Sequence, residues 1–74
     1  HGRTWTLQEK LELVQDRLRG GPVEVIGLIL ESEDRLEAVV TFVAVLELIR
    51  RGVVRVHQKE RFGPIHVEMR ETSA

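Results

Sequence analysis

The fold of this chain is decided by one stretch, residues 34–58, which reads DRLEAVVTFVAVLELIRRGVVRVHQ. Its first part is apolar at helical spacing and opens with Asp34, an acid that suits the positive end of a helix dipole. Gly52 can adopt the left-handed conformation that ends a helix, and the two arginines before it suit the negative end of the dipole. The stretch therefore predicts a helix over about residues 34–51.

Apolar residues occupy most of the circumference of this helix, so more than one of its faces is a candidate for burial in the core. A helical projection predicts one broad stripe facing the core, made of Ala38, Val39, Phe42, Val45, Leu46 and Ile49. A second apolar group lies on the flank of that stripe: Leu36, Val40 and Val43, beside Glu47 and Arg50. Leu48 is expected alone on the far side. Either a partner covers the second group, or the first helix and the hairpin of the same domain do.

After Gly52 the apolar residues recur at every second position, which is typical of strands. Residues 53–58 and 65–70 are expected to form the two strands of a hairpin, joined by the turn 59–64. A register with Gln58 opposite Ile65 gives three further pairs: Val56 with Val67, Val54 with Met69, and Arg55 with Glu68. The first two pairs would lie on the inner face and the charged pair outside.

Upstream of this stretch, the segment Thr6-Leu7-Gln8-Glu9 has the form of a capping box. It predicts a helix over about 7–19 that ends at Gly20-Gly21-Pro22, with Lys10 among its polar residues away from the apolar face. A short strand follows near 23–25. Residues 26–30 are apolar throughout except for Gly27, and their pattern allows a short buried helix or an irregular turn.

The order of elements is that of a winged helix-turn-helix domain of the α+β class, with three helices, a two-stranded β-hairpin wing and a short extra strand near 23–25. We expect the domain to span 6–70, with residues 1–5 a tag remnant or linker and 71–74 a polar tail. The chain has 74 residues, which allows one domain and makes an enzyme with its own deep pocket improbable.

Composition excludes several classes of site and location. The chain has no cysteine, and its 11 Lys and Arg against 12 Asp and Glu give a net charge of −1. There is therefore no disulfide and no thiolate metal site, and the broad basic field of a nucleic-acid binder is missing. No apolar run suggests a membrane span or signal peptide. We expect a cytoplasmic protein without membrane contact.

Catalytic or metal chemistry has little support in the sequence. In the expected register His57 and His66 face each other across the wing, but no residue nearby supplies a good third ligand. They are interpreted as solvated surface histidines, with contact to a partner as the alternative. We expect no enzyme activity, no metal and no cofactor.

Three kinds of interaction compete for the surplus apolar surface of the long helix. A DNA-binding winged helix would present basic or amide side chains to base edges, yet residues 39–49 offer only Thr41 and Glu47. Protein binding fits an apolar helix face better. Homodimerisation through the same face is a third hypothesis, which predicts weak self-association of the isolated chain.

Residues 40–52, VTFVAVLELIRRG, followed by VRVHQ at 54–58 and FGPI at 62–65, resemble the carboxyl-terminal domain of the segregation and condensation protein A family. These proteins are the kleisins of bacterial SMC condensin complexes. The resemblance is good over about 41–65 and looser before that. Pro64 departs from it where an acid is common, and Val43 where Leu is usual.

The resemblance implies a nucleoid-associated, non-catalytic module that docks on the ATPase head of an SMC protein and closes a ring in chromosome segregation and condensation. In the family, a central segment outside this domain recruits segregation and condensation protein B. The resemblance implies these partner-binding residues: Leu36, Val40, Phe42, Val43, Leu46, Glu47 and Arg50. Of these, Phe42 and Leu46 are expected to straddle core and interface. It also implies a wing motif that mainly fixes the turn and packs it down: Gln58, Phe62, Gly63 and Ile65.

Overall fold

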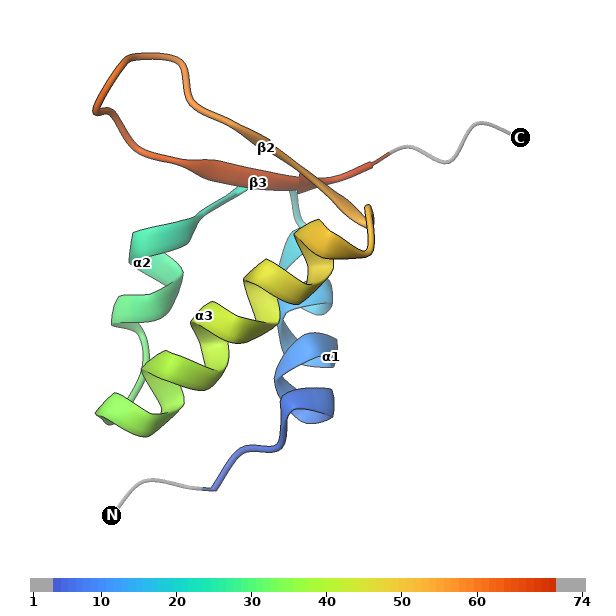
Figure 1. The fold of residues 1–74 in the computed structure, drawn as a ribbon, viewed down its shortest axis with the longest axis vertical. Coiled ribbons are helices and arrows are strands. Elements are labelled where there is room, and N and C mark those ends of the chain that lie inside the picture. The colour runs from blue at the N-terminus through green and yellow to red at the C-terminus, as the bar shows by residue number, and fades with distance from the viewer. Residues whose placement is uncertain (1–3, 71–74) are drawn as a thin grey trace.

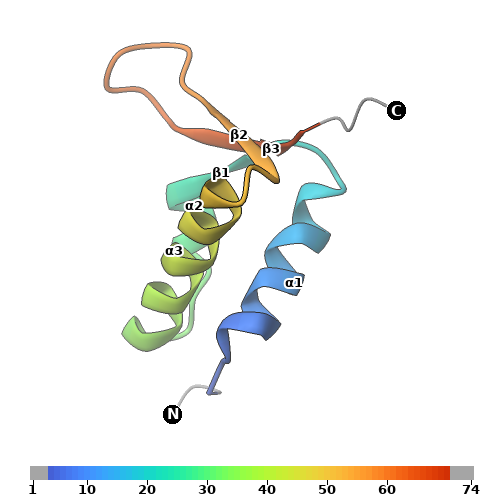
Figure 2. The ribbon, with the colours of Figure 1, turned by 45° about the vertical axis from the view of Figure 1, so that its right-hand side comes forward.

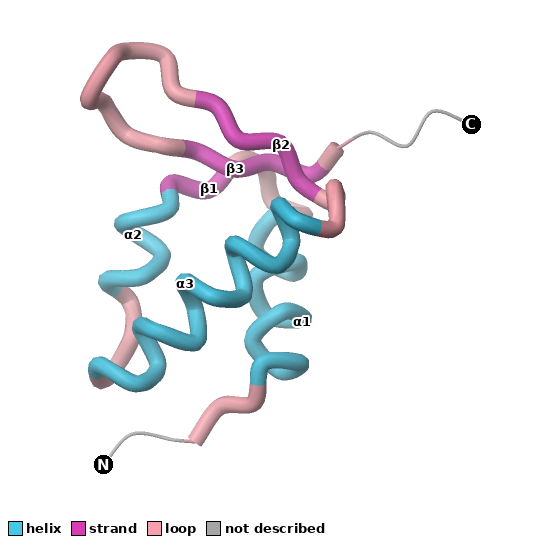
Figure 3. The backbone as a smooth tube through the Cα atoms, in the orientation of Figure 1, coloured by secondary structure: helices cyan, strands magenta, loops and turns pink. Residues whose placement is uncertain are grey.

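The computed structural model describes residues 4–70 and shows a winged helix (Figure 1). Its elements follow in the order α1 (Leu7–Leu18), β1 (Val23–Glu24), α2 (Val25–Leu30), α3 (Arg35–Arg50), β2 (Val54–His57) and β3 (His66–Met69). The three helices lie on one side of the small sheet, and the hairpin of β2 and β3 extends beyond them as the wing (Figure 3). Residues 1–3 of the expected linker 1–5, and the expected polar tail 71–74, lie outside the described residues.

The hairpin has the register that the alternation predicted. Val54 pairs with Met69, Arg55 with Glu68, Val56 with Val67, and His57 with His66. The short strand β1 pairs antiparallel with the other edge of β3, so the sheet has three strands in the order β1-β3-β2. The sheet thus joins the segment after α1 to β3, the last strand of the described residues.

The capping box at the start of α1 is confirmed. The hydroxyl of Thr6 accepts a hydrogen bond from the amide of Glu9 at 3.1 Å, and the Glu9 carboxylate accepts one from the amide of Thr6 at 3.0 Å. After α1 the chain turns at Gly21, whose φ of 122° lies in a region that L side chains rarely adopt. Both ends of the helix are therefore determined locally.

The ambiguous segment is a helix, α2, and Glu24 is the reason. Its carboxylate accepts hydrogen bonds from the amides of Ile26 and Gly27, both at 2.8 Å, and so satisfies donors that a helix start leaves free. A Cβ at Gly27 would lie only 3.1 Å from Glu24 Oε1, so the glycine that weakened the helix prediction makes room for the cap. Val25 and Leu28 of α2 are buried in the core.

The predicted core face of α3 is wrong. The buried residues of this helix are Thr41, Ala44, Val45 and Leu48. Leu48, expected on the far side, is 1% exposed, whereas most of the predicted stripe points outward: Val39, Phe42, Leu46 and Ile49. Only Val45 of that stripe is fully buried, with Ala38 half-buried.

Close packing of two helices explains this choice of face. Figure 2 shows α1 alongside α3, and the two helices share a long contact. The small side chains of Ala44 and Thr41 let α1 approach, and Thr41 Oγ1 donates to the carbonyl of Glu37 at 2.8 Å, which satisfies its hydroxyl inside the core. The core unites all of the helices with the sheet: Leu11, Val14, Leu18, Val25, Leu28, Ala44, Val45, Leu48, Val54 and Val67.

Candidate functional site

The side of α3 that faces away from the core is almost entirely apolar. We call it the outer face of α3; it consists of Leu36, Val39, Phe42, Val43, Leu46 and Ile49, all exposed. These residues recur at spacings of three and four, so they form a continuous strip along the helix. An apolar strip that runs the length of a helix on a small domain is the usual sign of a protein-binding surface.

The structure distributes the predicted partner-binding residues between this strip and its edge. Four of them lie on the outer face: Leu36, Phe42, Val43 and Leu46. Val40 is half-buried, and the Glu47 side chain is only 20% exposed. Arg50 is exposed at the last turn. Sequence reasoning missed Val39 and Ile49 as surface residues because it assigned their stripe to the core.

The carboxyl-terminal edge of the outer face carries a small charge cluster. The carboxylate of Glu47 accepts hydrogen bonds from Arg50 Nε at 2.9 Å and from Arg51 Nε at 2.7 Å. The hydrogen bonds from Arg50 and then Arg51 lower the pKa of Glu47 to about 2. Glu47 is thus ionised at any physiological pH and holds both arginines beside the last turn of α3.

The wing turn is held by hydrogen bonds, while its aromatic residue is free of the core. Gln58 Nε2 donates to the carbonyl of Gly63 at 2.7 Å, and the amide of Gly63 donates to the carbonyl of Glu60 at 2.9 Å. The expectation that Phe62 packs the wing down is wrong, because this side chain is 94% exposed. Ile65 is also exposed, at the foot of the turn. Within the wing motif, Gln58 and Gly63 therefore hold the turn through hydrogen bonds, whereas Phe62 is exposed on its surface.

The two wing histidines lie side by side. The rings of His57 and His66 are stacked, with centroids 5.6 Å apart and an angle of 17° between their planes. Glu68 Oε1 lies 4.0 Å from His57 Nε2 and 3.1 Å from Arg55, so this carboxylate serves mainly as the partner of the arginine. Within residues 4–70 no three His, Asp or Glu side chains converge as metal ligands.

A buried ion pair joins α1 to α3 and was missed by the sequence analysis. Lys10, expected on the polar face of its helix, is 2% exposed. Its ammonium lies 2.7 Å from Glu37 Oε2 and 3.8 Å from the centroid of the Trp5 ring. The cation is therefore enclosed by an opposite charge and an aromatic face. Only the three-dimensional arrangement of Trp5, α1 and α3 could reveal it.

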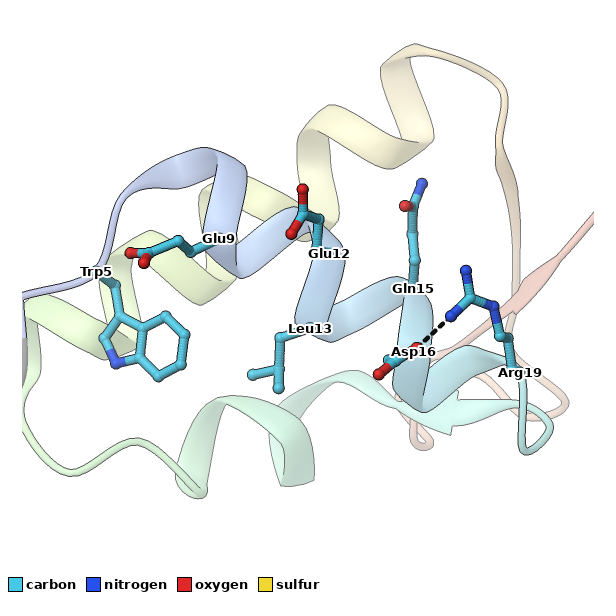
Figure 4. Close-up of a pocket in the computed structure, with 7 residues that line it drawn as sticks. All are labelled: Trp5, Glu9, Glu12, Leu13, Gln15, Asp16 and Arg19. Atoms are coloured by element: carbon cyan, nitrogen blue, oxygen red, sulfur yellow. Dashed lines mark hydrogen bonds and ion pairs between the residues drawn. The ribbon is translucent and has the colours of Figure 1, made fainter.

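An open groove runs along α1, on the surface that Figure 4 shows. Its lining consists of Trp5, Glu9, Glu12, Leu13, Gln15, Asp16 and Arg19. The carboxylates are engaged locally: Asp16 pairs with Arg19, Glu12 accepts from Gln8 at 3.0 Å, and Glu9 belongs to the capping box. The groove holds no nucleophile beside a base, so the outer face of α3 is the stronger candidate site.

In the described part of the chain, no helix has the length and apolar character that crossing a bilayer requires.

Comparison with known proteins places this geometry in a family. The family model described as "Segregation and condensation protein ScpA" matches residues 5–70. The chain is 44% identical to segregation and condensation protein A of Myxococcus xanthus over 63 residues, which cover 81% of this chain and 22% of that protein. It is 38% identical to the protein of the same name from Clostridium perfringens (strain SM101) over 65 residues, or 86% of this chain and 26% of the relative.

A relative from Clostridium botulinum, with the same name, is 31% identical over 68 residues, which cover 90% of this chain and 27% of that protein. The chain therefore spans about a quarter of the length of these relatives. The match to the family model takes in α1, the sheet and the whole of α3. On this evidence of sequence and fold, the chain belongs to the segregation and condensation protein A family.

Proposed function

We propose that this chain is a non-catalytic interaction module of a condensin-type complex. In this proposal it docks through the outer face of α3 onto the ATPase head of an SMC protein, and so serves chromosome segregation and condensation. The observation that carries the proposal is the apolar strip on α3, which lies opposite the face that the domain uses for its own core. Membership of the family supports the choice of an SMC protein as the partner.

The charge distribution favours a protein partner over DNA. The outer face offers no Lys, Asn or Gln for base edges, and residues 31–51 contain five acids and three arginines. Two of those arginines are held by Glu47, so their charges are largely neutralised locally. An apolar strip with few free cations matches an apolar groove on a protein far better than a phosphate backbone.

A charge placed in the strip tests the proposal. Val43 is 41% exposed, so Val43→Glu should leave the thermal unfolding midpoint nearly unchanged while abolishing capture of the chain by an isolated SMC ATPase head. The matched control is Leu30→Glu, which puts the same charge on an exposed apolar position of α2, outside the strip, and should bind normally.

Three results would contradict the proposal in different ways. Unchanged binding by the Val43→Glu chain would show that the outer face of α3 is not the docking surface. A chain that forms stable dimers in light scattering at two concentrations, and loses them on Val43→Glu, would assign the face to self-association. Tight and strongly salt-dependent binding of DNA would favour a nucleic-acid partner.

A further inference from the structure

The tip of the wing holds an aromatic residue in an unfavourable conformation. Phe62 has a φ of 65° and is the one non-glycine residue in the described part of the chain with a positive φ. Bulky side chains rarely adopt this region because their Cβ crowds the following carbonyl. The same residue exposes 94% of its surface to solvent. Phe62 is therefore in an unfavourable state in two respects: its backbone is strained, and its apolar ring is exposed to water.

The turn around Phe62 is held in place on both sides. The amide of Gly63 donates to the carbonyl of Glu60 at 2.9 Å, and Gln58 Nε2 donates to the carbonyl of Gly63 at 2.7 Å. A Cβ at Gly63 would lie 3.1 Å from the Glu60 carbonyl oxygen, so a side chain here would require this carbonyl to move by a few tenths of an ångström. These contacts fix the backbone that carries the ring, and the ring is presented in a defined place.

The domain receives no stability in return for this conformation. Phe62 is absent from the core, and its neighbours in the turn, Glu60 and Arg61, are exposed polar residues. Strained residues that contribute nothing to packing are concentrated at sites that bind a ligand or partner. Aromatic side chains presented on a rigid support are also the residues that dominate protein interfaces.

The wing tip lies away from α1. In Figures 1 and 2 it projects beyond the helices on the side of α2 and α3. Val56 lies on the same strand face as the buried Val54 and Val67, yet it is 47% exposed on the edge strand β2. Ile65 adds further exposed apolar surface at the foot of the turn. The wing therefore carries exposed apolar surface of its own, apart from Phe62.

We infer that Phe62 is an anchor residue that inserts into an apolar pocket on the partner that receives the outer face of α3. The inference rests on the proposed function, since it assigns a second contact on the same ATPase head. The partner would then be bound at two places: the outer face of α3, and the ring of Phe62, which becomes buried on binding. The hydrogen bonds of Gln58 and Gly63 then serve to orient that ring before binding, which lowers the entropy lost on docking.

Replacing Phe62 with glycine separates this role from a structural one. Glycine adopts a φ of 65° without strain, so Phe62→Gly should leave the thermal midpoint unchanged or raised. Affinity for the SMC ATPase head, measured by calorimetry, should fall about tenfold or more because the ring is lost. Arg61→Gly is the control at the neighbouring position, and Phe62→Tyr should retain most of the affinity.

The outcomes distinguish this inference from the proposed function. If Phe62→Gly binds as tightly as the unchanged chain while Val43→Glu does not bind, the anchor is contradicted and the docking face stands. A clear drop in the thermal midpoint of Phe62→Gly would also overturn the inference, because the ring would then stabilise the fold. If the unchanged chain fails to bind an SMC ATPase head, the proposed function fails and the anchor fails with it.

Discussion

The ammonium of Lys10 on α1 lies 2.7 Å from the carboxylate of Glu37 on α3, and the two side chains are only 2% and 12% exposed. The face of Trp5 covers the same ammonium. Glu37 also accepts a hydrogen bond from the amide of Glu33 at 2.8 Å, so its carboxylate links the start of α3 to α1. This arrangement fixes the angle between the helix that carries the outer face and the helix that supports it.

Removing the charge of Glu37 should destabilise the domain strongly. Glu37→Gln leaves the Lys10 ammonium buried without its counter-charge, and we expect a loss of about 3 kcal/mol in the free energy of unfolding, measured with urea. Glu31→Gln is the control, because it breaks an ion pair with Arg17 that is exposed on the surface, and it should have little effect. Equal effects of the two substitutions would show that burial of the Lys10 pair is energetically unimportant.

The face of α3 that forms the core can be tested with two leucines. Leu48 is 1% exposed and Leu46 is 47% exposed. Leu48→Ala should lower the free energy of unfolding by about 2–5 kcal/mol because it removes core contacts and leaves a cavity. Leu46→Ala should cost much less. Chemical denaturation of both variants measures the difference, and the reverse order would restore the face that the helical projection predicted.

The end of α3 depends on a glycine with a positive φ. Gly52 has a φ of 74°, while no φ in that range occurs at Gly20. Gly52→Ala should therefore destabilise the domain by about 1 kcal/mol. Gly20→Ala, whose Cβ would meet only the Arg17 carbonyl at an ordinary 3.5 Å, should be neutral or slightly stabilising. Thermal unfolding of the two chains compares them directly.

The charge cluster at the end of α3 should make stability depend on pH in the acid range. Arg50 and Arg51 lower the pKa of Glu47 from 4.5 to about 2 in the folded chain. A lowered pKa contributes stability that is complete above the unfolded value of 4.5 and is lost as the pH falls from there towards 2. Carbon NMR of the Glu47 carboxyl should show the low midpoint.

The substitution Glu47→Gln supplies the control for this titration. It should flatten the dependence of the unfolding midpoint on pH between 4.5 and 2, because the titrating group is gone. A Glu47 carboxyl that titrates near 4.5 in the folded chain would mean that the two arginines do not hold it in solution.

Local patterns in the sequence were sufficient for α1, α3 and the hairpin, whereas they left α2 open between a helix and a turn. Thr6 and Glu9 specify the start of α1 because a capping box needs only residues three apart. The hairpin register follows from alternation, since a shift of one residue would exchange the buried Val67 with its half-buried polar neighbours, His66 and Glu68, on the other face. The family resemblance, carried by residues 40–65, was likewise visible in the sequence alone.

The tertiary structure decided which side of α3 is buried, and therefore which residues form the candidate site. When a helix is apolar around most of its circumference, its own sequence does not indicate which side is buried. The choice was made by α1, which packs where Thr41 and Ala44 are small enough to let it approach, and Leu48 is buried as a consequence. The burial of Lys10 likewise depends on Trp5 and Glu37, which only the folded chain brings together.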